Sequence, residues 1–176
     1  MDIQSIISLA RKNDQLAFQK LFDMYSRPLF TTSYRITNNR EESKDILQEC
    51  FLDSFRKLDQ LSTAEKYPHW LRRMVINKSL KYLKSRRMHF DVLENDHEEI
   101  NHDEWYKSIS WETLKTEIQA LSDGCRTVFT LYALEDYKHS EISEILNIHV
   151  STSKSQYRYA CKILKSKLKK YIDHEI

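Results

Sequence analysis

The chain has a single glycine, Gly124, and two prolines, Pro28 and Pro68, among 176 residues. Sheet proteins reverse direction in tight turns, and these turns depend on Gly, Pro and Asn. Such a shortage of turn-forming residues favours long helices joined by few loops, and we predict an all-α fold. Apolar residues make up 40% of the sequence and charged residues 31%. This composition can build modest cores under a solvated surface, so disorder of the whole chain is not expected.

The net charge of +2 averages over strongly segregated charges. The stretch 71–90 contains no acidic residue and seven basic ones: Arg72, Arg73, Lys78, Lys81, Lys84, Arg86 and Arg87. The stretch 91–105 has seven acidic residues and no Lys or Arg, and 154–170 again has seven basic residues and no acidic one. A single block of this kind is an ordinary solvated face. Two basic blocks on helices with apolar seams instead indicate two polyanion-binding surfaces.

Changes in composition divide the chain into two small helical domains joined by an acidic linker. In residues 1–89, Asp14 is expected to cap one helix, and Asn39 with a glutamate three residues later resembles a capping box for the next. A third helix, expected at about Trp70 to Arg87, combines the basic residues with a wide apolar stripe. Residues 90–110 are acidic and are predicted to be linker. Residues 111–176 return to helical periodicity.

The segment 136–171 has the pattern of a helix-turn-helix. Ser140 is expected to cap a short helix over 141–146, and Asn147 opens a turn because Asn tolerates left-handed backbone. Ser151 is then expected to cap a longer helix. Its apolar seam is Tyr157, Cys161, Leu164, Leu168 and Tyr171. The alternative is a plain helical hairpin with a lysine-rich exposed face.

In a helix-turn-helix the first helix braces the second, and the N-terminal end of the second enters the major groove. Hydroxyl groups and unpaired N–H groups at a helix start can hold phosphate, while Gln and Arg side chains can read base edges. Lysines farther along the helix either contact the phosphates of the DNA backbone or only keep the protein soluble. The residues predicted to contact DNA are Ser151, Thr152, Ser153, Lys154, Ser155, Gln156, Arg158 and Lys162.

Four stretches of the chain resemble a known family. The C-terminal stretch IQALSDGCRTVFTLYALEDYKHSEISEILNIHVSTSKSQYRYACKILKSKL resembles the fourth conserved region of bacterial sigma factors. The N-terminal half resembles the second conserved region, in the family's order and spacing, through LAFQKLFDMYSRPLF, EESKDILQECFLDSFRKL and WLRRMVINKSLKYLKSRR. Nothing resembles the globular parts of the first and third regions, which points to the compact extracytoplasmic-function (ECF) group. The resemblance implies a factor that binds core RNA polymerase, directs it to promoters and assists DNA opening.

The resemblance also assigns roles by position. Docking on the clamp coiled coil of the polymerase's largest subunit would fall to Asp45, Ile46, Gln48 and Glu49. The basic helix expected at about Trp70 to Arg87 and the loop before it would melt the promoter and hold the minus-ten strand. The contacts would come from Arg72, Arg73, Asn77, Lys78, Lys81 and Lys84. Tyr67, His69 and Trp70 can line a base pocket there. The helix-turn-helix would read the minus-thirty-five element, although Tyr159-Ala160-Cys161 stands where the family usually has Arg-Ala-Arg.

Other functional classes have less support in the residues. The closest group of potential metal ligands lies in the predicted linker, at a spacing that does not stack on one helical face. It consists of His97, Glu98, Glu99 and His102. We therefore expect no metal, no cofactor and no enzymatic activity, since catalytic motifs are missing from the sequence as well. The alternative function is a dimeric helix-turn-helix regulator that binds operator DNA without docking on polymerase.

The sequence also carries expectations about location and partners. Cys50, Cys125 and Cys161 are odd in number and widely spaced, which favours reduced thiols in the cytoplasm. Neither a leader peptide nor a membrane-inserted segment is expected. The expected partners are core RNA polymerase and promoter DNA. Family members are commonly held by an anti-sigma factor, but no residue of this chain identifies one.

Overall fold

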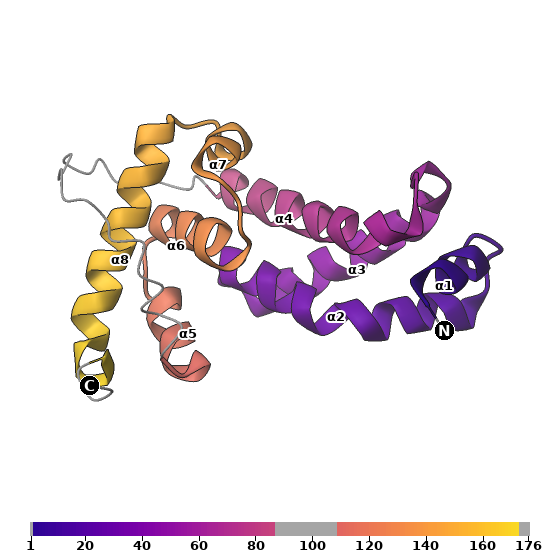
Figure 1. Ribbon diagram of the computed structural model, residues 1–176, viewed down its shortest axis with the longest axis horizontal. Helices are drawn as coiled ribbons and strands as arrows, with labels where there is room; N and C mark the ends of the chain where they lie inside the picture. The colour runs from indigo at the N-terminus through magenta and orange to yellow at the C-terminus, as the bar shows by residue number, and fades with distance from the viewer. Residues whose placement is uncertain (1, 87–108, 173–176) are drawn as a thin grey trace. The chain divides into compact units, whose positions relative to one another are not determined.

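The computed structural model describes residues 2–86 and 109–172 (Figure 1). These residues form helices and helical turns without any strand, so the predicted all-α fold is confirmed. The chain divides into two compact units, Met1–Arg86 and Arg87–Ile176. Residues 90–108 of the predicted acidic linker, with the cluster from His97 to His102, lie outside the described residues, whereas Ile109 is buried and Ser110 caps the next helix. Among the described residues, no helix has the length and hydropathy needed to cross a membrane.

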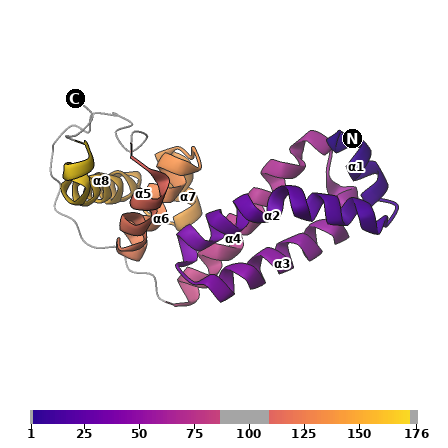
Figure 2. The ribbon, with the colours of Figure 1, turned by 90° about the horizontal axis from the view of Figure 1, so that it is seen from below.

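Four α-helices build the first unit. They are α1 (Ile3–Ala10), α2 (Gln15–Thr37), α3 (Arg40–Arg56) and α4 (Tyr67–Ser85). The long helix α2 packs against both α3 and α4, which also contact each other (Figures 1 and 2). Two single-turn 3₁₀ helices, η1 (Leu58–Gln60) and η2 (Ala64–Lys66), connect α3 to α4. The core of this unit includes a stacked pair, Phe18 and Phe55, with ring centroids 4.3 Å apart.

Polar caps set the starts of α2 and α3 where the sequence predicted them. The carboxylate of Asp14 accepts a hydrogen bond from the Ala17 N–H at 2.9 Å. The Asn39 side chain accepts from the N–H groups of Glu41 and Glu42 at 3.1 and 3.2 Å. These bonds satisfy N–H groups that have no partner inside the helix.

Neither proline of the chain ends a helix. Pro28 lies inside α2 and does not end it. Because Pro28 is exposed, the carbonyl that loses its intrahelical donor can bond to water. Helix α4 begins at Tyr67, a turn earlier than predicted, with Pro68 in its first turn. Proline is tolerated there because the first-turn N–H groups have no intrahelical acceptor.

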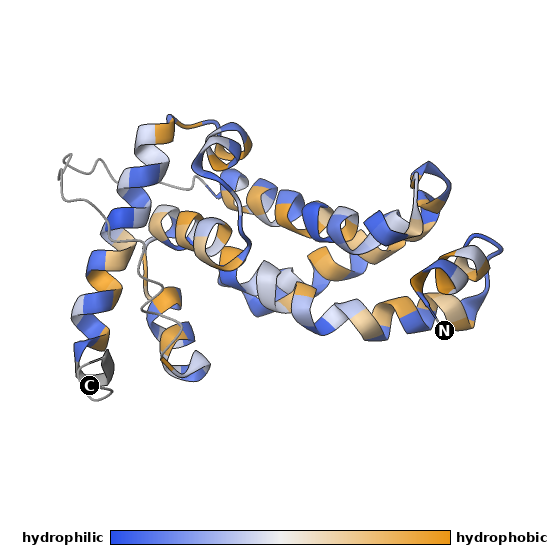
Figure 3. Cartoon of the chain, in the orientation of Figure 1, coloured by the Kyte–Doolittle hydropathy of each residue, from blue (hydrophilic) through white to orange (hydrophobic). Residues whose placement is uncertain are grey.

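The second unit is built around the C-terminal helix. Its described elements are α5 (Trp111–Gln119), α6 (Asp123–Phe129), a π-helical turn (Thr130–Leu134), α7 (His139–Leu146) and α8 (Val150–Ile172). Helix α8 contacts α5, α6 and α7, and buried residues as far along it as Leu168 show that α8 is held against the rest of the unit over most of its length. Figure 3 shows hydrophilic and hydrophobic residues interspersed along these helices, as expected for half-buried elements.

Helices α7 and α8 form the predicted helix-turn-helix. Asn147 between them adopts the left-handed conformation, with φ 55° and ψ 52°, as predicted. The two predicted serine caps are wrong, because both helices begin earlier. Helix α7 starts at His139, and the Glu141 carboxylate accepts from the Lys138 N–H at 2.8 Å. Ser151 lies inside the first turn of α8, where its carbonyl accepts from the Ser155 hydroxyl.

All three cysteines are free and buried. Burial raises the pKa of Cys50 to about 12 and that of Cys161 to about 11. The thiols of Cys50 and Cys161 are therefore protonated at neutral pH and act as small apolar core groups.

Candidate nucleic-acid interface

One face of α4 gathers four of the six residues predicted to contact the minus-ten strand. Arg73, Asn77, Lys81 and Lys84 are spaced four, four and three residues apart, which places them on one side of a helix. All four side chains are exposed. We call these four residues the α4 face. Arg72 is half-buried and points to a different side of the helix. The α4 face offers three cations and one amide to a polyanion.

Lys78 lies apart from the α4 face because its ammonium group is paired with α3. Its Nζ atom is 2.8 Å from Oε2 of Glu49 and 2.9 Å from Oδ2 of Asp53. Burial works to lower the pKa of Lys78, but the hydrogen bonds to the two carboxylates outweigh it and raise the pKa above its ordinary value. The structure therefore places Lys78 in an ion-pair cluster between two helices.

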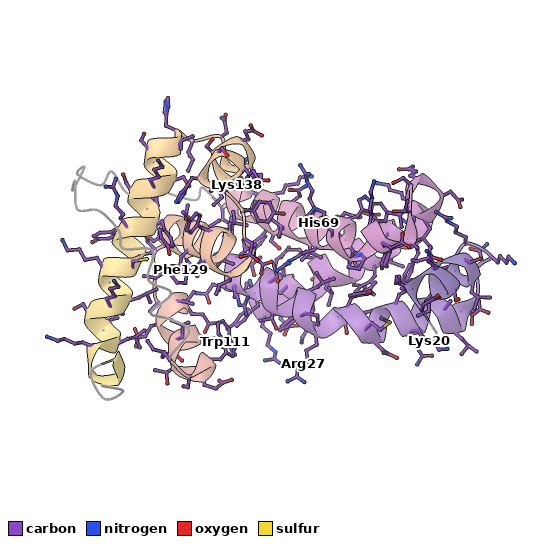
Figure 4. All side chains as sticks on the ribbon, in the orientation of Figure 1. Lys20, Arg27, His69, Trp111, Phe129 and Lys138 are labelled. Carbon is purple, nitrogen blue, oxygen red and sulfur yellow. The ribbon has the colours of Figure 1, made fainter. Side chains whose placement is uncertain are left out.

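The base pocket suggested by the sequence is not built as expected. Tyr67 is fully buried, and its hydroxyl lies 3.1 Å from that of Ser54, so it belongs to the core. Burial raises the pKa of Tyr67 to about 12. Trp70 is half-buried and packs against the same core. His69 is the exposed member of the three, on the first turn of α4 (Figure 4).

A second polar and cationic stripe runs along α8. Ser151, Ser155, Arg158 and Lys162 are spaced four, three and four residues apart and are exposed or half-exposed. We call these four residues the α8 face. Lys154 is exposed beside it, and Thr152 is half-buried. The α8 face begins at the end of α8 that follows the turn, as a recognition helix requires.

The structure corrects two of the predicted DNA contacts on α8. Ser153 and Gln156 are completely buried, because α8 turns them toward the other helices of the unit. The Ser153 hydroxyl lies 2.9 Å from Nδ1 of His139 on α7, and the Cys125 thiol donates to Oε1 of Gln156 at 3.0 Å. Both side chains therefore hold α8 in place rather than facing a ligand.

Aromatic stacking reinforces this contact between α7 and α8. The ring of His139 stacks on Tyr132, with centroids 4.2 Å apart and planes inclined by 14°. Tyr132 also contacts Tyr157 on α8, with centroids 4.5 Å apart. Such pairs add to the stability that area burial supplies, so they strengthen the packing of α7 against α8.

The outer side of α3 presents three of the four residues predicted to dock on polymerase. Asp45, Gln48 and Glu49 are exposed. Ile46 is 4% exposed and lies in the core, which corrects its assignment as a docking residue. Leu52 stands on the same side, seven residues after Asp45, and is 49% exposed.

Leu52 and Tyr159 are two exposed residues beside these faces that were not among the predicted contacts. In the sequence Leu52 follows Phe51, which belongs to the buried seam. The spacing of Leu52 from Asp45 and Glu49 nevertheless indicates that it lies on the same side of the helix as these two residues. Tyr159 is 42% exposed and follows Ser155 by four residues. Helical spacing along α8 is the signal that places Tyr159 next to the predicted DNA contacts.

The fold and its exposed faces define a DNA-binding protein of two helical modules. Residues 21–88 match the family model Sigma-70 region 2, and residues 111–164 match Sigma-70, region 4. The ECF RNA polymerase sigma factor SigW of Bacillus subtilis is 26% identical over 96% of this chain and 98% of its own length. The chain belongs to the ECF group of the sigma-70 family.

Further relatives agree with this assignment. The ECF RNA polymerase sigma-E factor of Escherichia coli K12 is 24% identical over 96% of this chain and 95% of its own length. The RNA polymerase sigma-H factor of Pseudomonas aeruginosa is 25% identical over 87% of this chain and 86% of its own length. A solved structure of RpoE in complex with the anti-sigma factor NepR, from Bartonella quintana, has a similar fold. Its TM-score is 0.55 at 15% identity, over 86% of this chain and 96% of that one.

Membership in this family fixes the class of activity. The protein is a sigma factor, which directs RNA polymerase to promoters and is not itself an enzyme. The alternative of a dimeric regulator without polymerase docking is not favoured, because the N-terminal unit matches a sigma-factor region. Among the described residues, no group of three or more His, Cys, Asp or Glu side chains could hold a metal ion.

Proposed function

We propose that this sigma factor contacts core polymerase through α3 and promoter DNA through the α4 and α8 faces. The docking side of α3 comprises Asp45, Gln48, Glu49 and Leu52. Its acceptor groups and one apolar side chain suit a helical partner with donor groups, such as the clamp coiled coil of the largest subunit. Glu49 keeps its side chain 66% exposed even while paired with Lys78, so it remains accessible to such a partner.

The α4 face would bind the minus-ten strand together with the loop that precedes α4. Holding an opened strand needs cations that follow the backbone and polar groups near the unstacked bases. Arg73, Lys81 and Lys84 supply the charge, and Asn77 lies between Arg73 and Lys81 on the same face. An amide there can hydrogen bond to a base edge. Arg72 and Lys78 are not part of this proposed set. Arg72 is half-buried, and Lys78 is ion-paired with Asp53 on α3.

The α8 face would enter the major groove at the minus-thirty-five element. Arg158 is the residue best suited to bidentate recognition of guanine, whereas Lys154 and Lys162 suit phosphate contacts. The hydroxyl of Ser151 lies at the start of the helix, where a small donor can approach the DNA backbone, and the Ser155 hydroxyl one turn later donates to the Ser151 carbonyl. The proposed domains are residues 1–89 and 111–176, with residues 90–110 as the connection between them.

The location and further partners follow from this role. A factor that works on core polymerase is placed in the cytoplasm, where transcription occurs in bacteria. The solved RpoE structure holds an anti-sigma factor, NepR, and an anti-sigma partner is accordingly proposed for this chain too. Its identity would be found by copurification, and an isolated partner should compete with core polymerase for this protein.

The observation that carries the proposal is that each unit, in its described residues, exposes a helix face with cations at helical spacing. The test is reconstitution of the full chain with core RNA polymerase, followed by transcription from promoter DNA. The triple variant Arg73→Ala/Asn77→Ala/Lys81→Ala should abolish promoter opening while core binding is retained. The matched control is Lys20→Ala/Arg27→Ala, which removes the same charge from the exposed side of α2 (Figure 4). If the control loses as much activity as the triple variant, the α4 face has no special role.

A further inference from the structure

Helix α1 lies against the segment that links α3 to α4. Ile6 and Ile7 on α1 share one buried core with Leu58 and Leu61 of that segment. Figure 2 shows α1 beside this connection, at the same end of the N-terminal unit. Helix α1 ends before residue 21, where the match to Sigma-70 region 2 begins, so its role is not defined by that region.

Arg11, which ends α1, hydrogen bonds to the backbone of the connection. Its Nη2 atom donates to the Leu61 carbonyl at 2.7 Å and to the Leu58 carbonyl at 3.3 Å, and Nε also donates to Leu58 at 3.4 Å. The Leu58 carbonyl at the start of η1 also accepts from the Leu61 N–H at 3.2 Å, so Arg11 adds a donor to it and bonds directly to the carbonyl that follows the turn. A guanidinium group presents several N–H groups in a fixed plane and can bridge two such carbonyls at once.

A second contact from α1 reaches the far side of the same connection. The Gln4 side-chain amide donates to Oε1 of Glu65 on η2. The hydrogen bond from Gln4 is the main reason that the pKa of Glu65 is lowered. Between the two anchors stand Ser62 and Thr63, both exposed. The connection is therefore held by α1 on both sides of Ser62 and Thr63, and these two exposed side chains are presented between the anchors.

We propose that Arg11 is a positioning residue for recognition of the minus-ten strand, acting through the loop Leu61–Lys66. Arg11 binds the carbonyls of Leu58 and Leu61 rather than the DNA, and it fixes where Ser62 and Thr63 stand ahead of η2 and α4. The inference rests on the proposed function, in which this loop and α4 hold the opened strand. A loop already held in its working conformation loses less entropy when a base binds, and it discriminates better between bases.

The experiment uses the full chain reconstituted with core RNA polymerase. Transcription is measured on a library of promoters randomised at the minus-ten element, and the base preference at each position is read from the enriched transcripts. Arg11→Ala is compared with Arg11→Lys, which keeps the charge and part of the hydrogen bonding. The matched control is Lys12→Ala, the exposed neighbouring cation. Binding to core polymerase and the melting temperature are measured for every variant.

Arg11→Ala should reduce the preference for the best minus-ten base by roughly tenfold, which corresponds to about 1.4 kcal/mol. The minus-thirty-five preference and core affinity should stay as in the unmodified protein. Arg11→Lys should recover part of the preference, and Lys12→Ala should match the unmodified protein.

Two outcomes overturn the inference. The first is an unchanged minus-ten preference in Arg11→Ala. The second is a general loss of transcription with the preference intact, which would mean that Arg11 serves only the stability of the fold. A different failure, in which the unmodified protein with core polymerase starts no transcription at promoters, would instead reject the proposed function. The controls keep these failures distinguishable.

Discussion

The ammonium group of Lys78 on α4 lies 2.9 Å from the carboxylate of Asp53 on α3. Glu49, one turn earlier on α3, contacts the same ammonium at 2.8 Å. One cation therefore balances two carboxylates at the seam between the two helices. This relationship separates Lys78 from Lys81, although the two lysines are neighbours in the basic segment of the sequence. We therefore predict that Lys78 stabilises the packing of α3 against α4, whereas Lys81 binds DNA.

Replacing Lys78 and Lys81 separately by Met should distinguish stability from DNA binding. Lys81→Met should lower the salt dependence of promoter binding by about 0.9 in the slope of log K against log salt for duplex, or about 0.7 for single strands. Lys78→Met should leave this slope unchanged and lower the free energy of unfolding by up to about 1 kcal/mol, the usual range for a partly exposed ion pair. Salt titrations of DNA binding and urea unfolding measure the two effects. Equal slopes for both variants would contradict the assignment.

Stability in acid should depend on Asp53. The hydrogen bond from Lys78 is the main cause that lowers the pKa of Asp53 below 3.8. Because the folded-state pKa is depressed, the stabilising contribution is present above the unfolded value and is lost as pH falls through the folded value. Asp53→Asn should therefore make the fall in unfolding free energy below about pH 4 shallower. Urea unfolding across this range tests it, with Asp59→Asn as an exposed control; identical curves for both variants would refute it.

Leu52 should contribute to polymerase docking more than to folding. Its side chain is 49% exposed, so Leu52→Ala removes little buried apolar area from the free protein. At the centre of an interface the same side chain becomes buried, and its loss should weaken core binding by about tenfold, or about 1.4 kcal/mol. Fluorescence titration with core polymerase measures the affinity. Leu16→Ala on α2, where Leu16 is 69% exposed, is the matched control. Equal affinities for both variants would place Leu52 outside the interface.

His139 should affect promoter binding only through the orientation of α8. His139→Ala removes the contact with Ser153 and the stacking on Tyr132. The free energy of unfolding of the C-terminal unit should fall by about 1.5–4.5 kcal/mol, the sum of one hydrogen bond and the two aromatic pairs with Tyr132 and Tyr157. His139→Phe keeps the ring and should lose less.

Differential scanning calorimetry measures the stability of these variants, and binding to minus-thirty-five DNA measures the consequence. The DNA affinity of His139→Phe should stay near that of the unmodified protein, because phenylalanine keeps an aromatic ring against Tyr132 and His139 is not expected to contact DNA. A large loss of DNA affinity in His139→Phe with full stability would mean that His139 touches DNA directly.

The sequence by itself determined the helical class and several local structures. One glycine in the whole chain predicted long helices, and Asp14 and Asn39 predicted two helix starts, because a capping side chain acts on N–H groups two or three residues away. Asn147 predicted the turn between α7 and α8 for a similar reason, since its left-handed backbone depends on its own side chain. Order and spacing of the motifs were enough for the resemblance to sigma factors, which the family matches confirm.

Tertiary structure alone decided which polar residues face outward. Lys78 and Lys81 are equivalent in composition, but only packing brings the carboxylates of α3 to Lys78. Ser153 and Gln156 occupy the expected start of a recognition helix, yet α8 buries them against partners distant in sequence, His139 and Cys125. The anchoring of the loop by Arg11 joins residues 47 and 50 positions apart. Short-range patterns set helices because their hydrogen bonds are local, whereas exposure depends on which distant surface covers each face.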